Sequence, residues 1–289
     1  MQNQKLLEVF LDTKKLLCEY DYYIHIPKKI IHITNSENMI PHLMGLQYAA
    51  RPDMFTGDRG TYMIKKGRLK YKSLEKLVQK YYRDENKRTS ILAMIHGKIN
   101  HLYRIKEMLS TYSTLYLYDV AANPHSELKT DYLLVNCQEE LVLQLGIVKA
   151  KSKKVQEYHC NSFMIAYKEN KDYDRHYRNL SQWYEINKIV REDKKSKRKE
   201  VIYQSKEAKE KELQGIEKML VAANIQISEN IAEIIFRLNQ KFGEYHTLDM
   251  LANSEQLMQK CEGETEEILI AEFVNMCENM KNKKKIRRI

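Results

Sequence analysis

Four short runs in the middle of the chain decide the fold class: STLYLYDV (113–120), ELKTDYLLVN (127–136), ELVLQLGIV (140–148) and EYHCNSFMIAY (157–167). Each run is rich in β-branched and aromatic residues, a composition that is typical of strands. The segments that connect them are short, and short connections join antiparallel neighbours. Helical periodicity precedes them, at 4–20, 73–82 and 85–112. The sequence therefore predicts an α+β fold with N-terminal helices followed by a four-stranded antiparallel sheet.

Two segments of the N-terminal half have a less regular pattern. Residues 21–27 and 28–34 are β-branched and aromatic, so each could form a short strand, with Pro27 limiting the pairing between them. Residues 51–72 contain Pro52 and three glycines among many cations, which predicts an irregular basic loop.

The last third of the chain differs in character. Charged and amphipathic segments follow one another from about residue 180, and the chain ends in the basic run KNKKKIRRI. We predict a domain boundary near residue 180, with an α+β domain over 1–180 and an all-α C-terminal extension with a basic tail over 181–289. The extension is a candidate surface for a protein partner or for dimerisation.

The charge is positive and unevenly spread. The 289 residues hold 49 Lys and Arg against 39 Asp and Glu, a net charge of +10, and residues 51–100 alone hold 13 against 5. Such a concentration favours a polyanionic partner, nucleic acid first. A solvated basic surface without a partner is the alternative.

Several classes of protein are disfavoured by what the sequence lacks. It has no run of about 18 apolar residues and no secretory signal pattern, so we expect a cytoplasmic protein and no membrane partner. The five cysteines form no CxxC pair, and neither a metal-binding motif nor a phosphate-binding glycine loop occurs. We therefore expect no metal and no cofactor.

Two places among the polar residues could support acid–base or phosphate chemistry. His42 lies at the start of a short helical segment beside the basic loop, where a histidine can exchange protons near neutral pH. Lys129 and Asp131 fall on one face of the expected strand. There the lysine could neutralise the charge that develops on a phosphate, and the aspartate could orient the lysine. The alternatives are a packing histidine and an ordinary ion pair.

The last expected strand supplies a third place. Its alternation puts His159 and Asn161 on one face and Cys160 and Ser162 on the other. The Ser162 hydroxyl could bind a phosphate oxygen, whereas the alternative is a serine that faces solvent.

Cations and tyrosines alternate in the basic loop, as in surfaces that stack bases beside bound phosphates. The cations that we expect to bind nucleic acid are Arg51, Arg59, Lys65, Lys66, Arg68 and Lys70, with Arg104 of the long helix as a further one.

Taken in order, these motifs resemble a known family. His-Leu-x-Gly-Leu begins at His42, Lys-x-Asp is formed by Lys129 and Asp131, and Ser-Phe begins at Ser162. This order resembles the phage-associated Barnase–EndoU–ColicinE5/D–RelE-like nucleases, in particular their fourth subgroup, over residues 4–168. Nothing in residues 185–289 resembles it.

The resemblance implies a metal-independent endoribonuclease of phage, mobile-element or toxin origin, in which the ribose 2′-OH attacks the adjacent phosphate. It implies an acid–base role for His42, stabilisation of the phosphate by Lys129 and orientation of the phosphate by Ser162. No motif supplies the second acid–base group, for which His159 and Asp131 are both candidates.

Two further hypotheses remain open at this point. The protein could be a non-catalytic factor of a mobile element that binds nucleic acid or protein through a nuclease-like fold. The C-terminal helices could also restrain a toxic nuclease.

Overall fold

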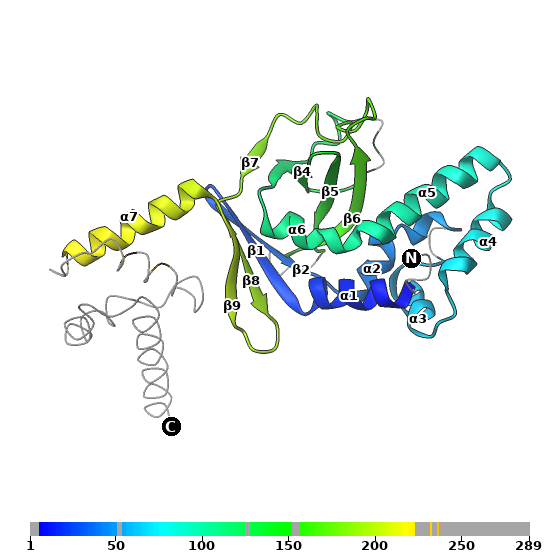
Figure 1. Ribbon diagram of the computed structural model, residues 1–289, viewed down its shortest axis with the longest axis horizontal. Coiled ribbons are helices and arrows are strands. Elements are labelled where there is room, and N and C mark those ends of the chain that lie inside the picture. The colour runs from blue at the N-terminus through cyan, green and yellow to red at the C-terminus, as the bar shows by residue number, and fades with distance from the viewer. Residues whose placement is uncertain are drawn as a thin grey trace, which may run out of the picture. The chain divides into compact units, whose positions relative to one another are not determined.

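The computed structural model describes residues 6–50, 54–124, 126, 128–151 and 157–222, together with Ala232 and Phe236 (Figure 1). The chain divides into two compact units, residues 1–197 and 198–289. The candidate site residues all lie in the first unit.

The first unit is built on one sheet. Its strands run in the order β7-β3-β4-β5-β6-β2-β1-β8. Neighbours are antiparallel except for β2 and β6, which are parallel. The strands are β1 (Tyr20–Ile26), β2 (Lys29–Thr34), β3 (Thr114–Leu117), β4 (Tyr132–Cys137), β5 (Leu141–Lys149), β6 (Glu157–Tyr167), β7 (Trp183–Glu185) and β8 (Lys188–Asp193).

Six α-helices of the first unit accompany this sheet: α1 (Leu6–Cys18), α2 (Ile40–Leu43), α3 (Gly57–Lys65), α4 (Tyr71–Tyr81), α5 (Glu85–His101) and α6 (Ile105–Ser110). The amphipathic pattern of α1 buries Leu6, Phe10 and Leu17. The Asp84 carboxylate caps α5 by accepting a hydrogen bond from the Lys87 backbone N–H at 2.7 Å. In Figure 1, α4 and α5 form a hairpin. Within the described residues, no helix is both long and apolar enough to cross a membrane.

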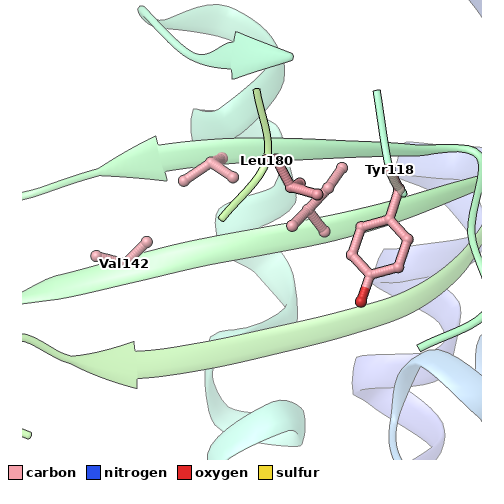
Figure 2. Packing of buried hydrophobic residues seen from close by; sticks show 5 residues of the cluster. Tyr118, Val142 and Leu180 are labelled. Atoms are coloured by element: carbon pink, nitrogen blue, oxygen red, sulfur yellow. The ribbon is translucent and has the colours of Figure 1, made fainter. Parts of the chain in front are cut away.

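Both faces of the central strands β4 and β5 are covered. Leu134, Leu145 and Phe163 lie in register on one face, and none of them is exposed. On the other face Leu133, Val135 and Val142 pack with Tyr118 and Leu180, which come from segments that cross over the strands (Figure 2). Because both faces of β4 and β5 are buried, these two strands have nearly continuous apolar sequences, whereas most residues of β6 are partly exposed.

The predicted fold class is wrong in two respects. The four strands expected over 113–167 are present and antiparallel to one another, but they are the centre of a larger mixed sheet. The segment after residue 180, predicted to be all-α, first supplies β7 and β8, and β8 pairs with β1. β7 has only three residues, of which two are aromatic. The apolar part of β8 is short and lies beside a long run of charged residues. Neither segment therefore shows a strand pattern in the sequence.

Two local predictions also need correction. Pro27 and Lys28 form the turn between β1 and β2, so the proline does not limit their pairing, and Lys28 takes the left-handed φ of 64°. The expected basic loop contains α3. A Cβ on Gly60 would lie 2.2 Å from the Phe55 carbonyl oxygen, so this glycine permits the close approach of two backbone segments.

The second unit begins with β9 (Lys199–Gln204) and α7 (Lys206–Ala222). The Ser205 hydroxyl caps α7 by accepting a hydrogen bond from the Ala208 N–H at 3.2 Å. Of the further helices expected after residue 222, only Ala232 and Phe236 are among the described residues, and the basic tail lies outside them.

Candidate functional site

A β-bulge in β6 creates the most unusual polar site of the sheet. Gly146 of β5 lies opposite Ser162, whereas the next residue, Ile147, lies opposite Cys160. Asn161 is therefore the extra residue of the bulge. Since Gly146 and Ile147 point to opposite faces, so do Cys160 and Ser162. The expectation that they share a face is wrong, because strict alternation does not hold across a bulge.

Three polar side chains converge over Gly146. A Cβ built on this glycine would lie 2.3 Å from Ser162 Oγ, 2.7 Å from Asn161 Oδ1 and 3.2 Å from Thr130 Oγ1. The absence of a side chain at residue 146 thus makes room for these oxygens. We call Thr130, Gly146, Asn161 and Ser162 the Gly146 cluster.

Two atoms of the Gly146 cluster lack a hydrogen-bond partner among the described residues. The Thr130 hydroxyl lies 2.8 Å from the Tyr132 carbonyl oxygen and 2.7 Å from that of Ile147, and the Asn161 amide NH₂ donates to the Lys129 carbonyl oxygen. Ser162 Oγ and Asn161 Oδ1 are buried without a hydrogen bond to the described residues. A buried polar atom without a partner is costly, so this pair is a natural place for a ligand to bind.

Asp131, directly before β4, and His159, near the start of β6, lie close to each other. Asp131 Oδ2 accepts a hydrogen bond from the Lys149 backbone N–H at 2.6 Å. Burial lowers the pKa of His159, and the negative charge of Asp131 partly offsets this effect. At neutral pH the imidazole is therefore mostly uncharged and able to accept a proton.

Lys129 is placed differently from the prediction. Strand β4 begins only at Tyr132, so Lys129 and Asp131 precede it and do not form a pair on a strand face. The Lys129 side chain is exposed, and it makes no hydrogen bond or ion pair within the described part of the chain. Its backbone carbonyl, which anchors Asn161, is what contacts the Gly146 cluster.

The His-Leu-x-Gly-Leu motif forms a second polar site. His42 lies in the single turn of α2, and Gly45 ends that turn in the left-handed conformation with a φ of 79°. A Cβ on Gly45 would lie 3.0 Å from Cδ of Lys98, so the lysine stem packs directly on this glycine. Burial lowers the pKa of His42, and the positive charge of Lys98 lowers it further.

The sequence analysis did not single out Lys98, although the sequence contains a signal. Lys98 lies on α5 at helical spacing from Ile91, Ile95 and Leu102, so it interrupts an apolar stripe. It is only 5% exposed, and burial lowers its pKa to about 8. Its Nζ lies 5.5 Å from the centre of the Tyr48 ring.

His176 is a second residue that the sequence analysis missed, and the segment around it has no periodic pattern that could have found it. Its Nδ1 lies 3.3 Å from Ser126 Oγ, and the Arg175 Nε–H donates to its Nε2 at 3.2 Å. Burial lowers the pKa of His176 to about 4, and the charges of Arg175 and Lys98 add to the shift.

Both polar sites are in contact with strand β6. Helices α2 and α5, which supply His42 and Lys98, both pack against β6, the strand that supplies Ser162. No hydrogen bond or ion pair joins His42 to the Gly146 cluster within the described residues. Those residues also contain no group of three or more His, Cys, Asp or Glu side chains that could hold a metal ion.

The cations predicted to bind nucleic acid fall into two groups. Some have partners within the protein: Lys65 pairs with Glu37 at 2.5 Å, Arg104 pairs with Glu107 at 3.0 Å, and Arg68 lies 5.2 Å from the Tyr62 ring. Others are exposed and make no ion pair in the described residues: Arg59, Lys66 and Lys70. Arg51 lies outside the described residues.

Comparison with known proteins identifies the class: the chain is a nuclease of the Barnase–EndoU–ColicinE5/D–RelE superfamily. More specifically, it belongs to the family described as phage-Barnase-EndoU-ColicinE5/D-RelE like nuclease4, whose model matches residues 5–208. The resemblance inferred from the motifs is confirmed, but the match continues beyond residue 168 through β7, β8 and β9, so it includes part of the segment 185–289 in which no resemblance was expected. Neither curated proteins nor solved structures gave a match.

Ser162→Ala tests the Gly146 cluster. The change removes a buried oxygen that has no partner, so we expect the free energy of unfolding to stay within about 1 kcal/mol of the wild-type value or to rise. Nuclease activity should fall about tenfold or more, because a hydrogen bond to a charged ligand is worth about 1.5–3 kcal/mol. Urea unfolding and cleavage rates measure the two effects. A large loss of stability would mean that the hydroxyl has a structural role.

Proposed function

We propose that this protein is a metal-independent endoribonuclease of phage or mobile-element origin, which cleaves RNA by attack of the ribose 2′-OH on the adjacent phosphate. The observation that carries this proposal is the family match over residues 5–208, which includes both polar sites. The uncharged His42 and the two unpartnered oxygens of the Gly146 cluster supply groups that such a reaction needs.

His42 is the proposed general base. A histidine whose pKa is lowered is largely unprotonated at neutral pH, so it can take the proton from the 2′-OH as the new oxygen–phosphorus bond forms. The electron pair of the bond to the 5′-oxygen then leaves with that oxygen, which needs a proton. The proposed source of this proton is the protonated form of His159, which the negative charge of the nearby Asp131 favours.

The phosphate is the proposed ligand of the Gly146 cluster. The Ser162 hydroxyl can donate to a non-bridging phosphate oxygen, and Asn161 Oδ1 can accept from a ribose hydroxyl. The exposed ammonium of Lys129, next to the cluster, would add positive charge on the solvent side.

The test compares matched RNA and DNA oligonucleotides, each with EDTA and with Mg²⁺. We expect the RNA to be cleaved at the same rate in both buffers and the DNA to remain intact. Cleavage of DNA, or cleavage that stops in EDTA, would overturn the proposed substrate or mechanism. Salt-sensitive binding without cleavage in any buffer would favour a non-catalytic binding factor.

Lys66 and Lys70 should contribute to RNA binding mainly through phosphate charge. Both side chains are exposed without an ion-pair partner in the described chain, so each is free to replace a counterion on RNA. For Lys66→Ala combined with Lys70→Ala, we expect the negative slope of log K against log salt to become shallower by about 1.4, or about 0.7 per contact for a single strand. Fluorescence anisotropy over a salt series measures it. An unchanged slope would remove this surface from the RNA interface.

A further inference from the structure

Lys98 is a buried cation without a carboxylate partner in the part of the chain that the structure describes. It is 5% exposed, and no ion pair or hydrogen bond of its ammonium is found within the described residues. The contact that the structure gives its Nζ is the Tyr48 ring, 5.5 Å away. Buried charges in proteins are as a rule paired, because an unpaired one is costly to desolvate.

The surroundings of Lys98 are built to hold its stem. Its Cδ would lie 3.0 Å from a Cβ on Gly45, so a side chain at residue 45 would displace it. Gly45 has a left-handed φ of 79°, which L-residues rarely adopt. The same glycine therefore closes the turn after His42 and makes room for the lysine. This arrangement fixes the ammonium in place before any ligand arrives.

The titratable groups around Lys98 do not neutralise it. They come from three segments: His42 of α2, Tyr48 of the following 3₁₀ turn (Leu46–Tyr48), and His176 of the segment before β7. Burial lowers the pKa values of both histidines and the charge of Lys98 lowers them further, so the two rings stay uncharged beside it at neutral pH. With a pKa of about 8, the lysine itself remains mostly protonated. The result is one positive charge among neutral polar groups.

We propose that Lys98 is a phosphate-binding residue of the nuclease, whose ammonium contacts a non-bridging oxygen of the RNA phosphate beside His42. This inference rests on the proposed function for the identity of the anion. In this proposal the buried Lys98 of α5 stabilises most of the negative charge of the phosphate, whereas Lys129 is exposed to solvent. Burial is the larger cause of the lowered pKa of His42, and Lys98 adds to it. A phosphate that pairs with the ammonium offsets the contribution of Lys98, so binding of phosphate raises the proton affinity of His42.

The experiment compares wild-type protein with Lys98→Met, which keeps the length of the stem and removes the charge. Lys76→Met, at an exposed position of α4, is the matched control. Melting temperatures are measured in inorganic phosphate and in chloride at equal ionic strength. We expect phosphate to stabilise the wild type and the control but not Lys98→Met. We also expect kcat/KM for RNA to fall about 100-fold in Lys98→Met alone, the size of effect seen when one charge-stabilising donor is lost.

A second readout needs no lysine variant, and it decides the matter if Lys98→Met fails to fold. The NMR signal of the His42 ring is identified by its loss in His42→Ala and then titrated with pH. We expect phosphate to raise the pKa of His42 in the wild type, and an unchanged pKa would overturn the proposal. Unimpaired RNA cleavage by a folded Lys98→Met would overturn it while leaving the proposed function intact. Phosphate binding by a wild type that cleaves no RNA would overturn the proposed function and the RNA identity of the anion.

Discussion

His42→Ala should reduce RNA cleavage about 100- to 10,000-fold, the range that a single general acid–base group contributes. The change removes the only histidine of the His-Leu-x-Gly-Leu motif, and alanine is compatible with the short helix α2. His96→Ala is the matched control, because His96 is also a helical histidine whose pKa is lowered by burial. The His96 ring stacks on that of Tyr71, with 4.5 Å between the ring centroids. Initial rates on an RNA oligonucleotide measure the effect.

The pH dependence gives an independent check of the role of His42. A general base acts in its unprotonated form, so the rate should fall as the pH drops through the pKa of His42. Because burial and Lys98 lower this pKa from 6.5, we expect the acid limb of log kcat/KM to lie below pH 6.5. An acid limb centred above pH 6.5, or equal loss of activity in His96→Ala, would contradict the assignment.

Gly146→Ala should destabilise the protein by about 1–3 kcal/mol, as other overpacked substitutions do. The new methyl group would lie 2.3 Å from Ser162 Oγ and 2.7 Å from Asn161 Oδ1, far inside van der Waals contact. Both oxygens would have to move to other side-chain rotamers, which for Asn161 disturbs the hydrogen bond from its amide to the Lys129 carbonyl oxygen. Gly146→Val should cost more, and it is expected to prevent folding. Urea unfolding followed by circular dichroism measures both variants.

A double-mutant cycle separates this steric effect from a general preference for glycine. Ser162→Ala removes the nearest oxygen, so Gly146→Ala should cost measurably less in that background, with a coupling within the 0.5–3 kcal/mol typical of residues in contact. Gly97→Ala is the control, because nothing lies within 4 Å of a Cβ at that helical position. It should be neutral or stabilising. Strict additivity of Gly146→Ala and Ser162→Ala would refute the clash.

The central strands were predictable from the sequence, whereas the edges of the sheet were not. Strands β4 and β5 are buried on both faces, so their apolar runs are long and unambiguous, and β6 still shows a run of β-branched and aromatic residues. β7 has three residues, and β8 pairs with β1, which is more than 150 residues away in the sequence. A short strand that depends on such a distant partner leaves little local signal.

The candidate site was predictable as motifs but not as an arrangement. The order of His42, Lys129 and Ser162 pointed to the family, which the match over residues 5–208 confirms. The bulge at Asn161 was not visible, because an extra residue in a strand changes the pairing without changing the composition. His176 was missed because its environment is made by tertiary contacts of an irregular segment.

The chemistry of the RNA ends tests the central claim most directly. Purified protein is incubated in EDTA with an RNA oligonucleotide, beside a copy that carries a single 2′-deoxy substitution at the cleaved position, and the fragments are analysed by mass spectrometry. We predict 2′,3′-cyclic phosphate and 5′-hydroxyl ends from the RNA and no cleavage at the substituted position. Fragments with 5′-phosphate ends, or cleavage of the 2′-deoxy copy at the same site, would contradict attack by the 2′-OH.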